Sequence, residues 1–152
     1  MVTTTTRAPR GAERHGIDYR FCDTETFLGL IRDGALLEHA AVHDHWYGTP
    51  REAVDAIVRT GRHALLLIDV QGAAQVRAAG IPALFVFLAP PSLDELERRL
   101  RERGTEDEPR IQARMEVAKR EMLKADDYDH VVVNDRREAA AARIKEIALR
   151  PD

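Results

Sequence analysis

The chain has 152 residues, of which 44% are hydrophobic and 32% are charged. This length and composition predict a single soluble globular domain with a buried core, and they exclude a disordered segment. The formal net charge of −3 and the pI near 6.1 argue against nucleic-acid binding, because sequence-independent affinity for a phosphate backbone needs a basic surface. No apolar run approaches the roughly 18 residues that span a membrane, so no membrane association is expected.

Cysteine usage indicates a reducing compartment. Cys22 is the only cysteine in the sequence, so the chain cannot form an internal disulfide. Disulfides are rare in the cytosol and common in secreted domains of this size, so we expect a cytoplasmic protein.

Short strands and helices are expected in the first third of the chain. Four segments rich in β-branched, aromatic or alternating apolar residues predict strands, at residues 2–6, 19–21, 36–42 and 46–48. Two helices are expected among and after these strands, at residues 24–32 and 50–60.

The rest of the chain alternates apolar runs with helical patterns. Residues 64–68 are continuously apolar and end at Asp69, which is typical of a strand buried on both faces of a parallel sheet. Two similar runs predict further buried strands, at residues 83–88 and 129–133. Helices are expected at residues 72–79 and 92–102, then in a long charged segment ending near 125, and at 136–149. This alternation predicts right-handed crossovers onto a parallel sheet.

Residue types suited to a nucleotide gather before residue 73. Arginines and tyrosines suit an anion, and carboxylates and hydroxyls suit the edge of a base; they occur at residues 5–10, 18–19, 37–40, 46–50 and 68–72. Neither G-x-x-x-x-G-K-[ST] nor G-x-G-x-x-G, the motifs that cradle a polyphosphate, occurs in the 152 residues.

Simpler interpretations exist for several of these residues. Asp69 could cap the helix that follows it, and Glu38 could face solvent from its strand. His39, His43 and His45 suggest a zinc site, but the spacing offers no convincing fourth ligand, so no metal site is predicted.

The segments together resemble the guanylate kinase family, nucleoside monophosphate kinases that move the γ-phosphate of ATP onto GMP. The resemblance covers the whole chain and rests on T-T-R-A-P-R, D-Y-R-F, L-E-H-A, Y-G-T-P, I-D-V-Q-G-A, P-P-S-L-D-E-L-E-R-R-L-R-x-R-G-T and V-V-V-N-D. It implies an α/β fold, a three-layer P-loop-kinase-like parallel sheet within one domain. A small β-rich GMP-binding subdomain is expected at about residues 3–50, the core at 51–102 and 127–152, and a lid at about 103–126.

The resemblance also implies roles for individual residues. Four residues match those that hold the GMP phosphate: Arg7, Arg10, Tyr19 and Tyr47. Four match those that bind guanine: Thr3, Glu38, Thr49 and Asp69. Three match ATP-side positions, with Arg103 and Arg114 as lid arginines that stabilise the transferring phosphoryl group and Asn134 beside the adenine.

The sequence also departs from the family pattern. The family begins with a strand, a P-loop and a helix, and Met1 stands where that unit has already ended, so the central strand is expected to be missing. Leu67 occupies the usual position of a second acid. Mg²⁺ is expected to accompany ATP if the P-loop is supplied, and unpaired sheet edges are expected to favour self-association. A GMP-binding pseudokinase and a module that binds a phosphorylated partner remain alternatives to a kinase.

Overall fold

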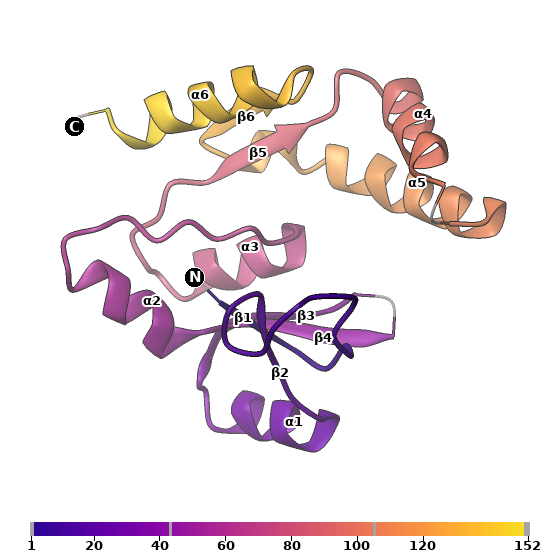
Figure 1. Ribbon diagram of the computed structural model, residues 1–152. Coiled ribbons are helices and arrows are strands. Elements are labelled where there is room, and N and C mark those ends of the chain that lie inside the picture. Colours follow the sequence, from indigo (N-terminus) through magenta and orange to yellow (C-terminus); the bar gives the residue numbers. More distant parts are fainter. Residues whose placement is uncertain (1, 43, 105, 151–152) are drawn as a thin grey trace. The chain divides into compact units, whose positions relative to one another are not determined.

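The computed structural model describes residues 2–42, 44–104 and 106–150, so His43 lies outside the described residues. The chain divides into two compact units, unit 1 at Met1–Ala83 and unit 2 at Leu84–Asp152. Each unit has its own strands and helices (Figure 1). Among the described residues, no helix is both long enough and apolar enough to cross a membrane.

Unit 1 contains a four-stranded mixed sheet, and it confirms the four strands expected before residue 51. The strands are β1 (Thr3–Thr5), β2 (Tyr19–Phe21), β3 (Leu36–Val42) and β4 (His45–Pro50). Their order is β2-β1-β4-β3; β1 and β2 are parallel, whereas β4 runs antiparallel to both β1 and β3. The register places Glu38 of β3 opposite Thr49 of β4.

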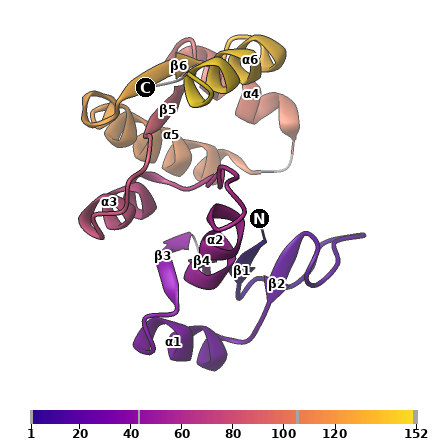
Figure 2. The ribbon, with the colours of Figure 1, turned by 90° about the vertical axis from the view of Figure 1, so that its left-hand side faces the viewer.

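Three helices belong to unit 1: α1 (Thr24–Arg32), α2 (Arg51–Val58) and α3 (Val70–Ala78). Local sequence explains where two of them begin, because an aspartate side chain accepts a hydrogen bond from a first-turn amide. Asp23 accepts from the Thr26 amide at 2.7 Å, and Asp69 accepts from the Gly72 amide at 2.9 Å. Figures 1 and 2 show α1 on one side of the sheet and α3 on the other.

The core of unit 1 forms around Phe27, whose side chain is completely buried and stacks on Trp46 with 6.0 Å between ring centroids. Gly48 of β4 lies directly against this core. A Cβ placed on Gly48 would be 2.8 Å from Cδ1 of Leu36 and 3.0 Å from Cζ of Phe27. The first contact is shorter than real Cβ atoms make and the second is at the tight limit, so glycine at this position lets the sheet and α1 pack closely.

A side chain of α3 fixes that helix to the exposed edge of β3. The Gln75 amide donates to the His39 carbonyl at 2.6 Å and accepts from the His39 amide at 3.0 Å. The Gln75 side chain thus supplies the same donor and acceptor as a neighbouring strand would. It pairs the backbone N–H and C=O of one residue on the edge strand.

The strand expected at residues 64–68 does not form, and this prediction was wrong. The segment has no ladder partner among the described residues, and it runs as irregular chain between α2 and α3 (Figure 1). Leu65 and Leu67 are 78% and 94% exposed instead of buried on both faces. A strand requires hydrogen bonds from a neighbouring strand. An apolar run that lacks a partner strand is therefore not stabilised as an extended, buried strand.

Unit 2 has a two-stranded parallel sheet, as the alternation of runs and helices predicted, formed by β5 (Val86–Ala89) and β6 (His130–Val133). Its helices are α4 (Leu93–Arg103), α5 (Glu108–Met122), the short 3₁₀ helix η1 (Ala125–Asp127) and α6 (Arg137–Ala148). Ser92 caps α4 as its sequence pattern predicts, with the hydroxyl accepting from the Glu95 amide at 3.1 Å.

Two separate hydrophobic clusters stabilise unit 2. One joins α4 to α5 through Leu100, Ile111 and Met115. The other joins β6 to α6 through Val132, Ala140 and Ile147. Helix α6 therefore covers one face of β6.

Candidate nucleotide-binding site

Arg7 is the most constrained of the four residues expected to bind phosphate. It follows β1, is only 7% exposed, and donates to neighbours through all three guanidinium nitrogens. Nε donates to the Tyr47 hydroxyl at 3.2 Å, Nη1 to the Ala8 carbonyl at 2.7 Å, and Nη2 to Glu13. The guanidinium also lies over the Tyr19 ring, 5.3 Å from its centroid. Its pKa is raised, first by the hydrogen bond to Glu13, so Arg7 stays charged.

Glu13 organises the loop that carries the second arginine. Its carboxylate accepts from Nη2 of Arg7 at 2.9 Å and from the backbone amide of Arg10 at 2.8 Å. The Arg7 guanidinium, followed by the Arg10 amide, lowers the pKa of Glu13. In contrast, the exposed side chain of Arg10 has no hydrogen bond or ion pair to any residue that the structure describes. Arg10 is therefore the arginine that is free to bind an anion.

The two tyrosines expected at the phosphate lie together beside Arg7. Tyr19 of β2 and Tyr47 of β4 meet edge to face, with 6.2 Å between ring centroids. Both are half-buried. Unit 1 thus brings together Arg7, Tyr19 and Tyr47, and Arg10 is linked to them through its backbone amide and Glu13.

Glu38, expected at the base, is buried rather than facing solvent. It is 5% exposed on β3, opposite Thr49, which is 1% exposed. Burial raises the pKa of the Glu38 carboxyl, and the charge of Asp69 raises it further, while hydrogen bonding from Thr49 opposes both effects. A buried carboxylate of this kind costs free energy unless something pairs with it, and this cost favours a ligand that donates hydrogen bonds.

The remaining base-site residues differ in their surroundings. Asp69 caps α3, as one interpretation of the sequence proposed, and its negative charge raises the pKa of Glu38. Thr3 lies half-buried on β1, paired with Tyr19 in the parallel ladder. Glu38, Thr49 and Asp69 therefore form a polar group in unit 1, whereas Thr3 contributes a neighbouring strand position at the start of β1.

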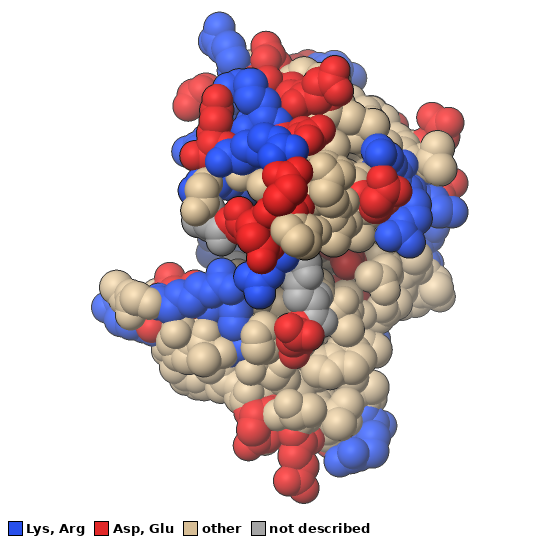
Figure 3. Space-filling model, turned by 90° about the vertical axis from the view of Figure 1, so that its right-hand side faces the viewer, with Lys and Arg blue, Asp and Glu red and all other residues tan. Residues whose placement is uncertain are grey.

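Charged side chains of both signs are interleaved over α4 and α5. These helices lie on the side of Figure 1 that faces the viewer in Figure 3, where blue and red atoms alternate in the upper part of the view. Arg98 pairs with Glu95 and Glu102, and Arg101 pairs with Glu97 and Glu108. These pairs lie on a solvated helix face and contribute little to stability individually.

The two arginines expected in the lid lie in unit 2 and differ from each other. Arg103 ends α4, is exposed, and has no hydrogen bond or ion pair within the described part of the chain. Arg114 of α5 is paired with Glu106, with 2.7 Å between Nη2 and Oε1. The second oxygen of Glu106 is buried and accepts no hydrogen bond from the residues that the structure describes.

Asn134, expected beside adenine, directly follows β6. Its backbone amide donates to the Ala89 carbonyl at 2.7 Å. Arg99 of α4 fixes the same turn, because its guanidinium donates to the carbonyls of Asn134 at 2.7 Å and Asp135 at 3.0 Å. One arginine thus connects α4 to the turn between β6 and α6.

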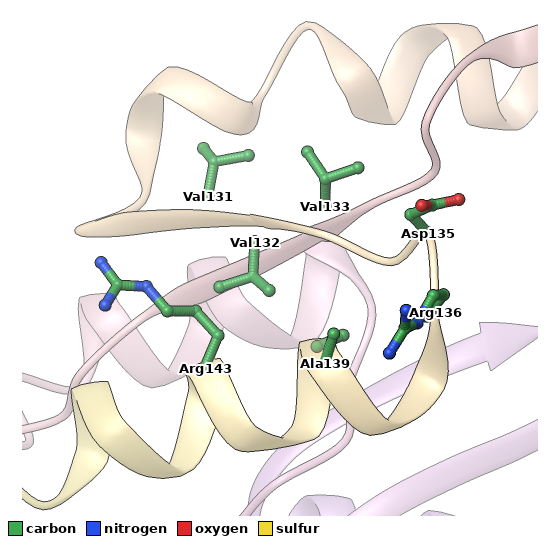
Figure 4. A pocket seen from close by; sticks show the side chains of 8 residues that line it. Val131, Val132, Val133, Asp135, Arg136, Ala139 and Arg143 are labelled. Atoms are coloured by element: carbon green, nitrogen blue, oxygen red, sulfur yellow. The ribbon is translucent and has the colours of Figure 1, made fainter.

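An open groove of about 570 Å³ lies beside that turn, between β6 and α6. Figure 4 shows Val132 pointing from β6 toward α6, while Val131 and Val133 point to the opposite side of the strand. Asp135, Arg136 and Arg143 supply the charged part of the lining. The groove belongs wholly to unit 2.

Sequence reasoning missed three residues that shape the site: Glu13, Gly72 and Arg99. Glu13 binds two phosphate-site residues, Arg99 holds the turn at Asn134, and Gly72 lies against the Glu38 carboxylate. Only the role of Glu13 could have been suggested by the sequence, because Glu13 closely follows Pro9 and Arg10 in the chain. Contacts across 35 residues, such as that between Arg99 and Asn134, have no sequence pattern.

The described residues contain no group of three or more histidine, cysteine, aspartate or glutamate side chains arranged to hold a metal ion. Mg²⁺ is commonly held by substrate phosphates and water with only one or two carboxylates, and such a site needs no cluster of this kind.

Comparison with known proteins shows which family this chain is similar to. The family model described as guanylate kinase matches residues 1–150. The guanylate kinase of Bacillus subtilis (strain 168) is 46% identical over 148 residues, covering 97% of this chain and 72% of that protein. The guanylate kinase of Synechococcus sp. (strain JA-3-3Ab) is 44% identical over 150 residues, covering 99% of this chain and 69% of that protein.

A solved structure matches as well. The crystal structure of guanylate kinase from Anaplasma phagocytophilum aligns with a TM-score of 0.80 at 38% sequence identity, over 97% of this chain and 72% of that one. The expected α/β fold class is thereby confirmed. The sequence matches across nearly the whole chain and the shared fold establish that this chain belongs to the guanylate kinase family, the nucleoside monophosphate kinases that phosphorylate GMP.

Proposed function

We propose that unit 1 binds GMP and that the chain serves the transfer of the γ-phosphate of ATP to GMP, giving ADP and GDP. The observation that carries the proposal is the arrangement of β4. Tyr47 and Thr49 lie two residues apart and therefore on the same face of the strand, about 7 Å apart along it. Tyr47 contacts Arg7, and Thr49 lies opposite Glu38. One strand face thus presents a phosphate end and a base end at a separation that suits one nucleoside monophosphate.

The phosphate end is proposed to hold a dianion by charge and by hydrogen bonding. Arg10 supplies the unpaired guanidinium, and Arg7, fixed by Glu13, supplies a second positive charge and orients the Tyr47 hydroxyl. Tyr19 adds a second phenol without adding charge. Charge-assisted bonds from guanidinium groups to phosphate are among the strongest that a protein makes.

The base end is proposed to select guanine over adenine. Guanine presents its N1–H and its 2-amino group as adjacent donors, and one carboxylate, Glu38, can accept from both. Adenine would offer neither donor and would leave the buried carboxylate with only its hydrogen bonding from Thr49, and such a mismatch discriminates strongly between ligands. Thr3, Thr49 and Asp69 complete the polar surroundings of the base.

The ATP side is proposed to lie in unit 2. Arg103 and Arg114 stabilise the charge of the phosphoryl group in transfer, which is the main task of a protein in this reaction. Asn134 lies beside the adenine. Because Arg114 is paired with Glu106 in this structure, it has to exchange that partner for phosphate. Mg²⁺, bound by the ATP phosphates, would neutralise their negative charge.

A non-catalytic role is the second candidate, either as a GMP-binding pseudokinase or as a module that binds a phosphorylated ligand. The observation in its favour is that the 152 residues contain no G-x-x-x-x-G-K-[ST] motif. We propose that GMP binding needs only the residues of unit 1, whereas phosphoryl transfer also needs a phosphate loop.

We also propose that the protein is cytoplasmic, a location favoured by the free thiol of Cys22.

Calorimetry with GMP, AMP and ATP tests the binding proposal. We expect GMP to bind measurably more tightly than AMP, and ATP to bind weakly. Equal affinities for GMP and AMP would contradict the assignment of Glu38 and Asp69 to base recognition. A coupled assay of ADP formation, with and without an added polypeptide that carries a strand and a P-loop, separates the kinase from the pseudokinase.

Self-association is proposed from the sheet of unit 2. That sheet consists of β5 and β6 alone among the described residues, so both strands have an outer edge. Exposed apolar residues of this unit include Leu84, Leu88, Val131 and Val133. Such edges are templates for pairing between chains. Sedimentation over a range of protein concentrations tests this, and a monomer at every concentration would contradict it.

A further inference from the structure

Gly72, in the first turn of α3, lies against the carboxylate of Glu38. A Cβ placed on Gly72 would be 2.6 Å from Oε2 and 3.3 Å from Cδ of Glu38. Glu38 is only 5% exposed, so little of its surface faces solvent. The carboxylate therefore occupies space that exists only because residue 72 has no side chain.

Helix α3 has its first turn set by its own cap and is joined to β3 one turn later. The Gly72 amide is held by Asp69, which sets the first turn of the helix. One turn later, Gln75 makes two hydrogen bonds to the backbone of His39, the residue after Glu38. Moving α3 away to make room for a side chain at residue 72 would therefore strain or break both hydrogen bonds between Gln75 and His39.

The atom that an added methyl group would meet is the free end of a flexible side chain. The backbone of β3 is not involved, and the next contact, to Cβ of Ile68 at 3.2 Å, is only slightly short. The response that costs least is rotation of the Glu38 side chain. A methyl group at residue 72 would therefore displace the carboxylate and leave the fold intact.

We infer that Gly72 is a positioning residue for guanine selectivity: it gives the Glu38 carboxylate the location from which it accepts the two guanine donors. This inference rests on the proposed function, because it assumes that Glu38 binds the base. It adds that selectivity for guanine depends on the glycine at position 72 of α3 as well as on Glu38 of β3.

The test is the Gly72→Ala variant, with binding of GMP and IMP measured by calorimetry. IMP lacks only the 2-amino group of guanine, so the ratio of the two affinities reports on the position of the Glu38 carboxylate and not on the phosphate. We expect this ratio to fall roughly 10-fold or more, as for the loss of a hydrogen bond to a charged acceptor. IMP keeps the N1–H donor, so its affinity should fall as well, but by less than that of GMP, and the thermal unfolding midpoint should change little.

Gly29→Ala is the matched control, because it makes the same chemical change within a helix of the same unit. A Cβ on Gly29 would meet only Nη2 of Arg32, at an ordinary 3.7 Å. We expect this variant to keep the GMP-to-IMP ratio of the natural chain. In a Glu38→Gln background, Gly72→Ala should leave the ratio unchanged, because the carboxylate it displaces is gone.

The outcomes separate this inference from the proposed function. If the natural chain prefers GMP to IMP and Gly72→Ala keeps that preference, the role of Gly72 is overturned while Glu38 keeps its own. If the natural chain shows no such preference, the assignment of Glu38 to guanine fails, and the inference fails with it. An equal loss of GMP and IMP affinity would show a general structural effect and would also overturn it.

Discussion

Arg7 and Glu13 form the ion pair on which the predicted phosphate site is built. Nη2 of Arg7 lies 2.9 Å from Oε1 and 3.0 Å from Oε2 of Glu13. The same carboxylate accepts from the Arg10 amide, so a buried arginine and the loop that carries an exposed arginine are held by one side chain. The pair therefore affects ligand binding through geometry, although Glu13 itself carries the wrong charge to bind phosphate.

Replacing Glu13 with glutamine should weaken GMP binding and leave guanosine binding nearly unchanged. The amide loses the charge that fixes Arg7, and the Arg10 loop becomes less ordered before the ligand binds. Calorimetry with both ligands measures the difference. Equal loss for GMP and guanosine would mean that Glu13 supports the whole of unit 1.

The pH dependence of the same variant provides a second measurement. Because the folded protein lowers the pKa of Glu13, the natural chain gains stability from this group above its unfolded pKa of about 4.3. That gain is lost as the pH falls through the lowered folded pKa. The stability difference between the natural chain and Glu13→Gln should therefore be constant near neutral pH and shrink in acid.

Arg10→Ala should weaken GMP binding while guanosine binding changes little. The exposed guanidinium has no partner among the described residues, so its loss removes a charge-assisted bond to phosphate, worth about 1.5–3 kcal/mol. Arg20→Ala is the control, because Arg20 belongs to the same unit and is paired with Glu52 at 2.8 Å. If Arg10→Ala reduced guanosine binding as much as GMP binding, Arg10 would have a structural role.

Glu38→Gln should stabilise the free protein at neutral pH and weaken the binding of both GMP and guanosine. Burial raises the pKa of Glu38, so the folded state is penalised as the pH rises from the unfolded pKa through the raised folded pKa. A neutral amide avoids this cost but mismatches the guanine donors. Thermal unfolding with and without ligand measures both effects, and a less stable free protein that binds guanosine normally would contradict this assignment.

Arg99→Ala should destabilise unit 2 and Arg98→Ala should not. Arg99 donates to two backbone carbonyls of the turn after β6, and the loss of two hydrogen bonds costs about 1–3 kcal/mol. Arg98, among the described residues, bonds to Glu95 and Glu102 of its own helix. Urea unfolding of both variants makes the comparison, and equal midpoints would show that the turn does not depend on Arg99.

Gly48→Ala should destabilise unit 1 by about 1–3 kcal/mol, because the methyl group would overpack the contact with Leu36 and Phe27. The Gly29→Ala variant, which adds the same group in open surroundings, serves as the reference. Thermal unfolding distinguishes them. A Gly48→Ala protein as stable as the natural chain would show that α1 can move away from the sheet.

The sequence by itself determined the elements whose causes are local. Ser92 caps α4 where the sequence indicated, because a capping box depends on neighbours within a few residues. The strands before residue 51 also formed where their composition indicated. The types of residue in the phosphate and base groups were also readable, since charge and hydrogen-bonding capacity belong to the side chain. The family followed from the order of these segments along the chain.

Only the tertiary structure decided which of these groups are buried, paired or free. The run at 64–68 has the composition of a buried strand, but a strand depends on a partner that composition does not supply, and Leu67 is almost fully exposed. Arg7 and Arg10 look alike in sequence, yet one is held by Glu13 and the other is unpaired among the described residues. Gly72 lies against the carboxylate of Glu38, which is 34 positions earlier in the sequence. Only the packing of the folded chain reveals this contact.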